Sequence, residues 1–334
     1  MLAEQTKTET IVCPLCKQQA IILTRDHPGY LEPARFSIAE CSSCDVQFAN
    51  PMEPSESVYE RIYEHAATLP GYSRYAWYAD QVFRRKNPLR WLESQEEMYA
   101  FIGSELERRG GARVGRVVEV GSGLGYLTYA LRSAGYDVRG LELSERAVQA
   151  SRARFGNFFE VCDVTQSTLQ TGIADAVILT EVIEHVPDPC ALLRGIRRML
   201  RPGGFALITT PNKSAAPRDS YWCTDNPPVH FWWFSETSMC RLAEASGLIV
   251  SFQGSDSRKL KPRFPSYFNA QGQQTSPSLL VRKLLQRYPG MVLRFAARVR
   301  SYRQRQTQRL AGAERGATMR VVLRPCNAPG HGNG

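Results

Sequence analysis

The sequence lacks long apolar runs. None of its 334 residues belongs to an uninterrupted apolar segment near the roughly 20 residues that a membrane-spanning helix requires. Residues 1–10 are polar and lack the apolar stretch of a secretion signal. We therefore expect a cytoplasmic, reducing location, where cysteines seldom pair as disulfides. Internal repeats are also missing, so the length predicts two or three distinct structural units with a sizeable core.

Acidic residues are missing from residues 257–313, a segment that holds 13 lysines and arginines. Because these 13 charges exceed the chain's total of +10, the residues outside the segment carry a net charge of −3. Residues 289–310 place apolar side chains at helical spacing among arginines, which predicts an amphipathic helix. We expect the stretch 279–310 to pack on the core, to lie peripherally on the inner face of an anionic membrane, or to bind an anionic substrate.

Nine cysteines in a reducing location need a purpose other than disulfides, and four of them have a spacing that supplies one. The pairs Cys13-Pro-Leu-Cys16 and Cys41-Ser-Ser-Cys44 are separated by 24 residues. Each pair can place two thiolates at the tip of a short turn, and two such turns make the tetrahedral sulfur site that suits zinc. Strand-like segments between the pairs are typical of a zinc ribbon. We expect structural Zn²⁺ in a unit spanning residues 1–50, with redox-active pairs as the alternative.

The segment Val117–Tyr126 is the most informative of the chain. Strand-like residues carry an acid, Glu119, and run into a turn with glycines at positions 121, 123 and 125, after which a helical pattern begins. Glycines let the backbone turn sharply and let a ligand approach bare main chain. A second strand-like run ends at Glu142, 17 residues after Gly125, where a carboxylate can accept hydrogen bonds from two ribose hydroxyls. The segment therefore predicts a nucleoside-binding βαβ unit.

The spacing of the glycine turn narrows the choice of nucleoside. Dinucleotide sites prefer G-x-G-x-x-G, whereas this turn reads G-x-G-x-G with an acid two residues before it. That acid would repel a pyrophosphate but suits the ammonium and sulfonium groups of S-adenosyl-L-methionine (SAM). The sequence here resembles the class I SAM-dependent methyltransferases, in a subset with an N-terminal zinc ribbon that acts on nucleotide sugars and other small metabolites. A nicotinamide-binding or ligand-free unit is the alternative.

The resemblance covers residues 90–256, with elements in the family's order. Asp163 follows the third strand, Ala174–Thr180 is a buried strand, and the turn at 201–204 precedes a fifth strand. The resemblance implies a Rossmann-like α/β fold with a mostly parallel sheet whose last strand is antiparallel. It also implies a set of cofactor-binding residues: Glu119, Gly121, Ser122, Gly123, Gly125, Glu142, Leu143, Asp163, Val164, Thr180 and Glu181.

Composition and motif positions divide the chain into six parts. We expect a zinc ribbon at 1–50, a helical linker and substrate cover at 51–110, the SAM-binding core at 111–256, a basic helical insertion at 257–316, the last core strand at 317–324 and a disordered tail at 325–334. The aromatic-rich segment 70–91 either lines the substrate side of the cleft or packs between two units. One amphipathic helix is predicted from Leu92 to Arg109.

The loop after the fourth strand carries candidate catalytic groups. Its string Glu181-Val-Ile-Glu184-His185 resembles the corresponding segment of ubiquinone-biosynthesis O-methyltransferases and of small-RNA 2′-O-methyltransferases. That resemblance implies that the two glutamates and the histidine ligate a divalent ion such as Mg²⁺. The alternatives are that His185 acts as a base or contacts substrate, or that the segment is structural.

A second histidine, His230, follows the fifth strand, with two prolines before it and aromatic residues after it. A histidine held by prolines and rings can serve as a general base at little entropic cost. The alternative is that His230 caps the helix predicted to start near Ser235. Together with His185 and Glu184, His230 completes the predicted catalytic set.

These motifs predict a SAM-dependent methyltransferase with a small-molecule acceptor, such as a sugar, a glycolipid precursor or a secondary metabolite. An RNA methyltransferase is the alternative, since zinc ribbons and basic extensions accompany that function too. The negative charge outside the basic segment disfavours RNA. A non-catalytic SAM-binding protein is the third class, which the intact glycine turn and two nearby histidines disfavour.

Overall fold

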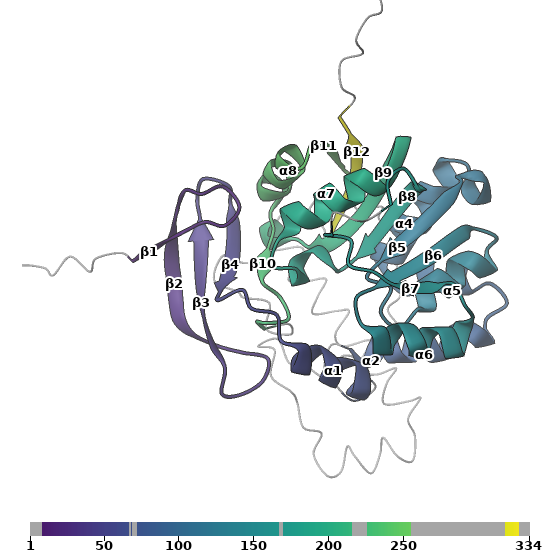
Figure 1. Ribbon diagram of the computed structural model, residues 1–334, viewed down its shortest axis with the longest axis horizontal. Helices are drawn as coiled ribbons and strands as arrows, with labels where there is room; N and C mark the ends of the chain where they lie inside the picture. Colours follow the sequence, from purple (N-terminus) through teal and green to yellow (C-terminus); the bar gives the residue numbers. More distant parts are fainter. Residues whose placement is uncertain are drawn as a thin grey trace, which may run out of the picture.

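The structure, a computed structural model, describes residues 9–66, 68, 72–166, 170–215, 226–254 and 318–326. These residues form a five-stranded and a seven-stranded β-sheet that lie beside one another (Figure 1). The predicted basic helix at 289–310 and residues 327–334 of the tail predicted at 325–334 lie outside the described residues, whereas Pro325 is the last residue of a strand. Across the described part of the chain, no helix has the length and apolarity needed to cross a membrane.

The smaller sheet, which we call the ribbon sheet, contains the predicted zinc ribbon and one further strand. Its order is β1-β2-β3-β4-β10, and all neighbours are antiparallel. The strand bounds are Thr10–Val12, Gln19–Pro28, Arg35–Cys41, Val46–Asn50 and, for β10, Trp232–Trp233. Trp232 pairs with Phe48, and Trp233 with Gln47. The sheet therefore does not end at residue 50, where the sequence predicts a boundary.

The larger sheet, which we call the core sheet, is mostly parallel with an antiparallel last strand, as the resemblance implies. Its strands lie in the order β11-β12-β9-β8-β5-β6-β7, and only the pairs that include β12 are antiparallel. The bounds are β5 Arg116–Val120, β6 Asp137–Glu142, β7 Phe159–Val161, β8 Ala174–Thr180, β9 Leu200–Pro211, β11 Leu248–Phe252 and β12 Thr318–Pro325. The predicted late antiparallel strand is confirmed. Strand order reverses between β5 and β8, and such sheets bind ligands outside the carboxyl ends of their strands at this point.

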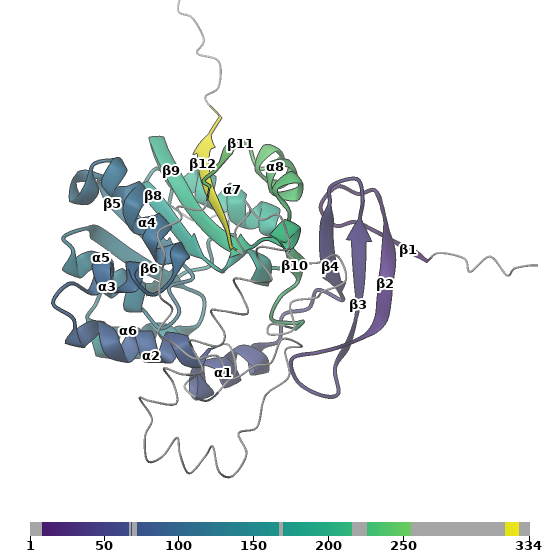
Figure 2. The ribbon, with the colours of Figure 1, turned by 180° about the vertical axis from the view of Figure 1, so that it is seen from behind.

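Helices cover both faces of the core sheet because successive strand residues point to opposite sides. Val117 packs on one side with α2 to α6, whereas Val118 packs on the other side with α7, α8 and the ribbon sheet (Figures 1 and 2). The helix bounds are α2 Ser73–Gln81, α3 Pro88–Glu93, α4 Glu97–Arg108, α5 Tyr126–Ser133, α6 Glu145–Phe155, α7 Pro189–Met199 and α8 Glu236–Ala245. Short 3₁₀ helices lie at η1 Val82–Arg84, η2 Gly111–Arg113, η3 Ile183–His185 and η4 Lys213–Ala215.

One predicted helix is divided in two. The sequence predicts a single helix from Leu92 to Arg109, whereas the structure has α3 and α4 with a break at residues 94–96. Ser94 closes α3 by donating its hydroxyl to the Trp91 carbonyl at 2.7 Å. Glu96 precedes α4 and accepts the Tyr78 hydroxyl at 2.6 Å. These contacts outweigh the helical periodicity of the sequence at this point.

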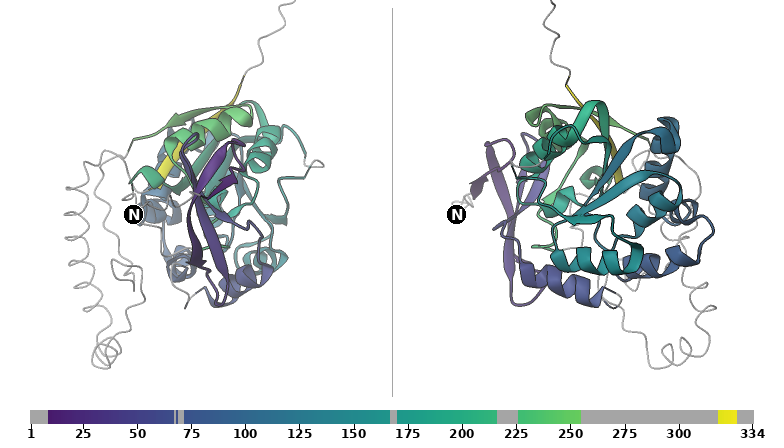
Figure 3. Two further views of the ribbon diagram at one scale, coloured as in Figure 1. Left: turned by 90° about the vertical axis from the view of Figure 1, so that its left-hand side faces the viewer. Right: turned by 45° about the vertical axis from the view of Figure 1, so that its right-hand side comes forward.

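Helix α1 (Glu56–His65) leads from the ribbon sheet to the base of the core (Figure 3). Ser55 occupies its N-cap position, but its hydroxyl is hydrogen-bonded to the Ser57 hydroxyl instead of the helix backbone. Arg146 of α6 forms an ion pair with Glu64 of α1 at 2.6 Å. Helix α1 is thereby tied across the side of the core where the strands end.

Candidate cofactor and acceptor site

A cavity of about 970 Å³ opens at the carboxyl ends of β5, β6 and β8, where the strand order reverses. Its volume is at the upper end of the roughly 300–1,000 Å³ typical of ligand sites, which leaves room for a cofactor and a second small molecule. Loops after the strands form its floor, and α1 and α2 form its cover. The predicted cofactor residues that line it are Glu119, Gly121, Ser122, Gly123, Glu142, Leu143, Asp163, Val164, Thr180 and Glu181.

The three glycines of the turn serve different purposes. A Cβ at Gly121 would come within 2.5 Å of a Val182 methyl carbon, and one at Gly125 would come within 2.8 Å of the Ser151 hydroxyl oxygen. These two glycines therefore let the turn pack closely, and Gly125 does not line the cavity. A Cβ at Gly123 would meet no atom within 4 Å. The backbone at Gly123 is the part of the turn that a ligand can approach.

The backbone fixes the carboxylate of Glu142 at the end of β6. One of its oxygens accepts the N–H groups of Leu143 and Ser144 at 2.8 and 3.1 Å, and the other accepts the Gly123 N–H at 2.9 Å. Glu142 is held beside the glycine turn, where ribose hydroxyls can reach it. Leu143 is 69% exposed despite being apolar, and it borders the cavity together with buried Val164. Two apolar side chains beside this carboxylate suit a flat purine ring.

Glu119 lies in β5 directly below the glycine turn. Its side chain is buried, and it accepts a hydrogen bond from the Thr128 hydroxyl of α5. Burial raises the pKa of Glu119 to about 8, although the hydrogen bonds from Thr128 act in the opposite direction. A nearby cation would favour the charged form of this carboxyl. The position therefore suits a ligand that carries an ammonium or sulfonium group.

Asp163 follows β7 and borders the far end of the cavity. Its carboxylate accepts the Thr165 N–H at 2.9 Å, the Thr165 hydroxyl at 2.7 Å and the Gln166 side-chain amide at 2.8 Å. Burial raises the pKa of Asp163, but these hydrogen bonds outweigh burial and hold the pKa below its usual value. Asp163 thus shapes the turn after β7 and places a carboxylate at the end of the cavity beyond Glu142.

Two histidines from distant segments face each other at the cavity wall. The ring centroids of His185 and His230 lie 4.6 Å apart at an interplanar angle of 79°. His185 Nδ1 lies 2.8 Å from the Val229 carbonyl oxygen, so this nitrogen carries the hydrogen and Nε2 is the basic nitrogen. Glu184 is fully buried behind the histidines, and it accepts the Thr210 hydroxyl at 2.9 Å. Glu184 does not line the cavity, so it does not contact an acceptor directly and would act through the histidines or through an ion that they share.

The histidines also belong to a candidate metal site. Ligand atoms of Glu184, His185 and His230 lie within 4.8 Å of one another, close enough to hold one ion. This set differs from the predicted ligands Glu181, Glu184 and His185, because His230 takes the place of Glu181. Glu181 lines the cavity at the end of β8 with a left-handed backbone, φ 53°. The 3₁₀ turn η3 that follows carries the other two residues toward His230.

Helix α1 contributes side chains to the cavity that are not among the site residues predicted from the sequence. Tyr59, Ile62 and Tyr63 line the cavity, at the spacing of one helical face. Burial raises the pKa of both tyrosines, so their hydroxyls stay protonated and can donate hydrogen bonds. The four-residue spacing of the two tyrosines is the signal that could have marked this face.

The aromatic-rich segment 70–91 serves both of the uses that the sequence allows. Tyr72 and Tyr75 line the cavity. Trp77, Tyr78 and Trp91 instead pack on one another, with ring centroids 5.4 to 5.8 Å apart. The division follows the faces of α2, one of which borders the cavity while the other packs on α3.

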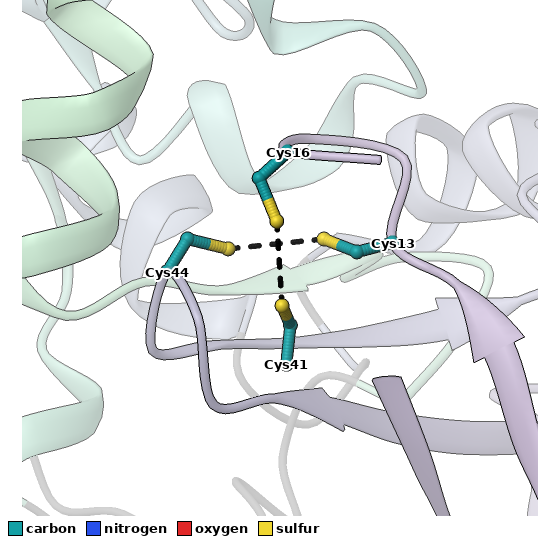
Figure 4. Close-up of side chains that lie close together, drawn as sticks. All are labelled: Cys13, Cys16, Cys41 and Cys44. Carbon is teal, nitrogen blue, oxygen red and sulfur yellow. Dashed lines mark hydrogen bonds between the residues drawn. The ribbon is translucent and has the colours of Figure 1, made fainter. Parts of the chain in front are cut away.

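The four cysteines predicted to bind zinc meet at the tip of the ribbon (Figure 4). The sulfur atoms of Cys13 and Cys44 are 3.7 Å apart, and those of Cys16 and Cys41 are 3.4 Å apart. Sulfurs at tetrahedral corners, each about 2.3 Å from one zinc ion, lie about 3.8 Å apart. Hydrogen bonding between Cys13 and Cys44 lowers the pKa of Cys13 and raises the pKa of Cys44, so one thiol of the pair becomes the thiolate that ligates metals. The cluster therefore has the geometry of a zinc site.

Comparisons with known proteins agree with this site. A family model described as a methyltransferase domain matches residues 94–251. The chain is 34% identical over 134 residues to the ubiquinone biosynthesis O-methyltransferase of Bordetella avium, a match that covers 38% of this chain and 51% of that protein. It is 29% identical over 137 residues to the protein of the same name from Pectobacterium atrosepticum, covering 39% and 52%. The chain thus spans about half the length of these curated relatives.

Among solved structures, a chain from the complex between the Haloferax volcanii Trm112 methyltransferase activator and a methyltransferase is similar, with a TM-score of 0.45 and 18% identity. That alignment covers 74% of this chain and 96% of the other. The segment matched by the family model contains the glycine turn, Glu142, Asp163 and the loop after β8, which form the floor of the cavity. Residues 94–251 therefore form a methyltransferase domain, and the core sheet beneath the cavity has the mostly parallel, Rossmann-like arrangement of such domains.

Proposed function

We propose that this protein transfers a methyl group from SAM to a hydroxyl oxygen of a small-metabolite acceptor. The observation that carries the proposal is the pair His185 and His230 at the wall of the cavity. Methyl transfer is an in-line displacement at a sulfonium whose charge already activates the leaving group. The protein must therefore align the acceptor and accept its proton. An imidazole beside the acceptor can accept that proton near neutral pH.

The proposed step uses the two histidines as follows. The acceptor hydroxyl gives its proton to the basic nitrogen of His185, or to His230, as its oxygen attacks the methyl carbon. The bond between that carbon and the sulfonium sulfur breaks, and S-adenosylhomocysteine leaves with a neutral sulfur. The Val229 carbonyl holds the His185 ring in one tautomer, so the acceptor meets a nitrogen that can take the proton.

The lining of the cavity supports a small hydroxylated acceptor. Six carboxylates and two arginines border the cavity: Glu60, Glu119, Glu142, Glu145, Asp163, Glu181, Arg74 and Arg146. The tyrosines of α1 and α2 add flat walls and hydroxyl donors. The name of the curated relatives, O-methyltransferase, supports oxygen as the acceptor atom. A lining rich in carboxylates opposes RNA, whose phosphates would meet like charge.

Two metal sites belong to the proposal. Zn²⁺ on the four cysteines of the ribbon stabilises that unit. At the cavity, the two imidazoles and one carboxylate of His185, His230 and Glu184 fit Mn²⁺, Fe²⁺ or Zn²⁺ better than Mg²⁺, which prefers oxygen ligands. An ion there would bind the acceptor oxygen and lower its pKa. Metal-assisted transfer is thus the alternative to base catalysis by the same histidines.

Transfer from SAM labelled with ¹³C in the methyl group tests the function. The full chain is incubated with a panel of sugars, phenols and catechols and, separately, with RNA. The chemical shift of the labelled carbon distinguishes O-methyl from N-methyl and C-methyl products. We expect label in the O-methyl product of at least one small acceptor. Label that enters only RNA, or only nitrogen or carbon, would contradict the proposal.

A further inference from the structure

Two acids of the ribbon sheet flank one pair of cysteines and meet at a single lysine. Glu40 precedes Cys41, and Asp45 follows Cys44, so the acids lie on either side of what we call the cysteine turn, residues 41–44. Lys213, in η4 after β9, pairs its ammonium group with both carboxylates, and its Nζ lies 3.1 Å from a Glu40 oxygen. The lysine side chain is only 16% exposed, so salt screens this contact less than an ion pair on the open surface.

The backbone of the same lysine contacts the segment that carries His230, which we call the histidine segment, residues 226–235. The Lys213 N–H donates to the Phe234 carbonyl at 2.8 Å, and the neighbouring Asn212 forms a β-bridge with Phe234. Phe234 directly follows β10 and lies four residues beyond His230. Lys213 therefore connects the cysteine turn, through its side chain, to the histidine segment, through its backbone.

Asp45 makes a second contact between the cysteine turn and the histidine segment. Its carbonyl accepts the hydroxyl of Ser235, the N-cap residue of α8, at 2.8 Å. The ribbon also holds the histidine segment through β4, which pairs with β10, and through the Tyr30 N–H, which donates to the Pro227 carbonyl at 2.7 Å. Both of those contacts lie outside the cysteine turn. A change within the turn therefore reaches the histidine segment first through Asp45 and Lys213.

The other end of the histidine segment sets the position of both imidazoles. His185 Nδ1 lies 2.8 Å from the Val229 carbonyl oxygen, and the Phe231 N–H donates to the Glu184 carbonyl at 2.9 Å. The rings of His185 and His230 are 4.6 Å apart between centroids. A shift of the segment therefore changes how the two rings face each other.

We propose that Lys213 is a positioning residue that couples zinc on the four cysteines to the geometry of the two histidines. The inference rests on the proposed roles of the histidines and of the ribbon zinc. Zinc fixes the cysteine turn, so that Glu40 and Asp45 hold Lys213 and the histidine segment in place. Loss of zinc frees the turn and weakens this hold. Such a coupling is reciprocal, so the loss of Lys213 also weakens zinc binding.

NMR signals of the histidine rings test the coupling without an acceptor. The chain has five histidines, so the ring ¹H–¹³C spectrum of the full chain is simple to resolve. Cys41→Ser, which should lack the ribbon zinc, should shift the signals of His185 and His230 and leave that of exposed His65 in place. In Lys213→Met, which keeps the length of the side chain but not its charge, the shift caused by adding Cys41→Ser should fall to about half or less.

Two further backgrounds serve as controls for this double-mutant comparison. Lys213→Arg keeps the positive charge and should keep most of the response to Cys41→Ser. Arg201→Met removes a different partly buried ion pair, which Arg201 forms with Asp175 at 2.6 Å near the amino end of β8. It should keep the full response, because that pair lies at the edge of the core sheet opposite the cavity.

Zinc affinity is the second readout and needs only zinc and a competing chelator. Lys213→Met should bind zinc about 5- to 10-fold more weakly than the wild type, because of the reciprocal coupling. The lost cation also counts directly, since four thiolates around one zinc ion carry a net negative charge that an ammonium group nearby stabilises. Lys213→Arg and Arg201→Met should bind zinc as the wild type does.

Each contrary outcome overturns the coupling in its own way. Unmoved His185 and His230 signals in Cys41→Ser would show that the zinc state does not reach the histidines. A full response in the Lys213→Met background would show that another contact carries it. If a Cys41→Ser protein does not fold, unchanged zinc affinity in Lys213→Met overturns the inference. If the coupling is present but no small hydroxyl compound is methylated, the coupling stands and the proposed function alone is contradicted.

Discussion

The ribbon sheet and the core sheet are stabilised in different ways. Helices and the ribbon cover the core sheet on both faces, so its central strands are almost entirely buried. The ribbon sheet packs one face on the core, while Val12, Ile21 and Leu23 on its β1 and β2 strands are 51%, 45% and 41% exposed. A small sheet covered on one side buries little apolar area, and such units usually depend on a metal or on disulfides. The ribbon should therefore depend on its cysteines and on its contact with the core.

The two sheets meet at the segment that carries His230. The carbonyl of Phe231 accepts the Ala49 N–H of β4 at 2.9 Å, which joins this segment to the ribbon. The N–H of the same residue donates to the carbonyl of Glu184 at 2.9 Å, which joins it to the core. His185 comes from the core, whereas His230 comes from this junction. The chemistry that we propose therefore depends on how the two sheets are held together.

The largest effect is expected from removing the zinc ligands. Purified protein should contain one equivalent of zinc by elemental analysis. Cys41→Ser should lose it and lower the melting temperature by about 10 °C, the shift that a loss of about 3–5 kcal/mol produces in a domain of this size. SAM affinity should change little, because the floor of the cofactor cavity belongs to the core sheet.

The control for this variant is Cys240→Ser, which replaces an exposed cysteine of α8 that lies outside the cluster. It should keep both the zinc and the melting temperature. Full zinc content in Cys41→Ser would show that the four thiols do not form the metal site.

The next largest effect is expected at the histidines. His185→Ala and His230→Ala should each reduce turnover by about 10²- to 10⁴-fold if the imidazole is the base, while SAM affinity stays close to that of the wild type. Single-turnover rates and calorimetry measure the two quantities separately. Normal turnover in both variants would mean that the proton leaves by another route.

A matched control variant tests whether the loss is specific to these two histidines, and a chelator distinguishes base catalysis from metal-assisted transfer. His65→Ala replaces an exposed histidine of α1 and should behave as the wild type. If a chelator abolishes turnover without releasing the ribbon zinc, and Mn²⁺ restores it, the metal-assisted mechanism replaces base catalysis by the histidines.

A smaller effect is expected at Glu142 in the core sheet, where a substitution should change SAM affinity and not zinc content. Glu142→Ala should weaken SAM binding by roughly 10- to 150-fold, because the ribose hydroxyls lose a charged partner worth about 1.5–3 kcal/mol. Zinc content should not change. Glu160→Ala removes an acid of β7 that pairs with Arg139 and should leave the Kd for SAM as it is. Unchanged SAM affinity in Glu142→Ala would refute the ribose assignment.

The buried carboxyl of Glu119 predicts a pH effect on the core. Burial raises its pKa from 4.5 to about 8, so the folded state keeps the proton over a range in which the unfolded state has lost it. Its contribution to stability is therefore present at low pH and is lost as the pH rises from about 4.5 through about 8. Between pH 6 and 7.5, the free energy of unfolding of the SAM-free wild type should fall by about 2 kcal/mol relative to that of Glu119→Gln. Denaturant unfolding at several pH values measures the free energy of unfolding of both proteins. The same pH dependence in the wild type and in Glu119→Gln would contradict the prediction.

The sequence predicts those parts of the site that depend on local spacing. The glycine turn, Glu142 at a strand end and the two C-x-x-C pairs each lie within a single turn or strand, so their geometry follows from neighbouring residues. Strand β8 also has the predicted bounds, since a short apolar run defines it. In these places local pattern and final fold agree.

The parts that the sequence does not predict depend on contacts between distant segments. Nothing near Trp232 indicates that it joins a strand of the N-terminal ribbon. The burial of Glu184 is not visible in the sequence either, because the direction of its side chain depends on how η3 packs against the segment that carries His230. Arg74 has no recognisable motif, because its place in the cavity depends on how α2 docks over the glycine turn.

The smallest effect tests the junction between the sheets. Phe48 of β4 is buried, and its ring centroid lies 5.9 Å from that of Trp232, two residues beyond His230. Phe48→Leu keeps an apolar side chain but loses the ring contact, at a cost of about 1 kcal/mol. Because the junction then holds His230 less firmly against His185, turnover should fall by up to about tenfold while zinc content and SAM affinity stay unchanged. Ile21→Leu on the exposed face of the ribbon is the control. Wild-type turnover in Phe48→Leu would show that the ribbon does not position the histidine.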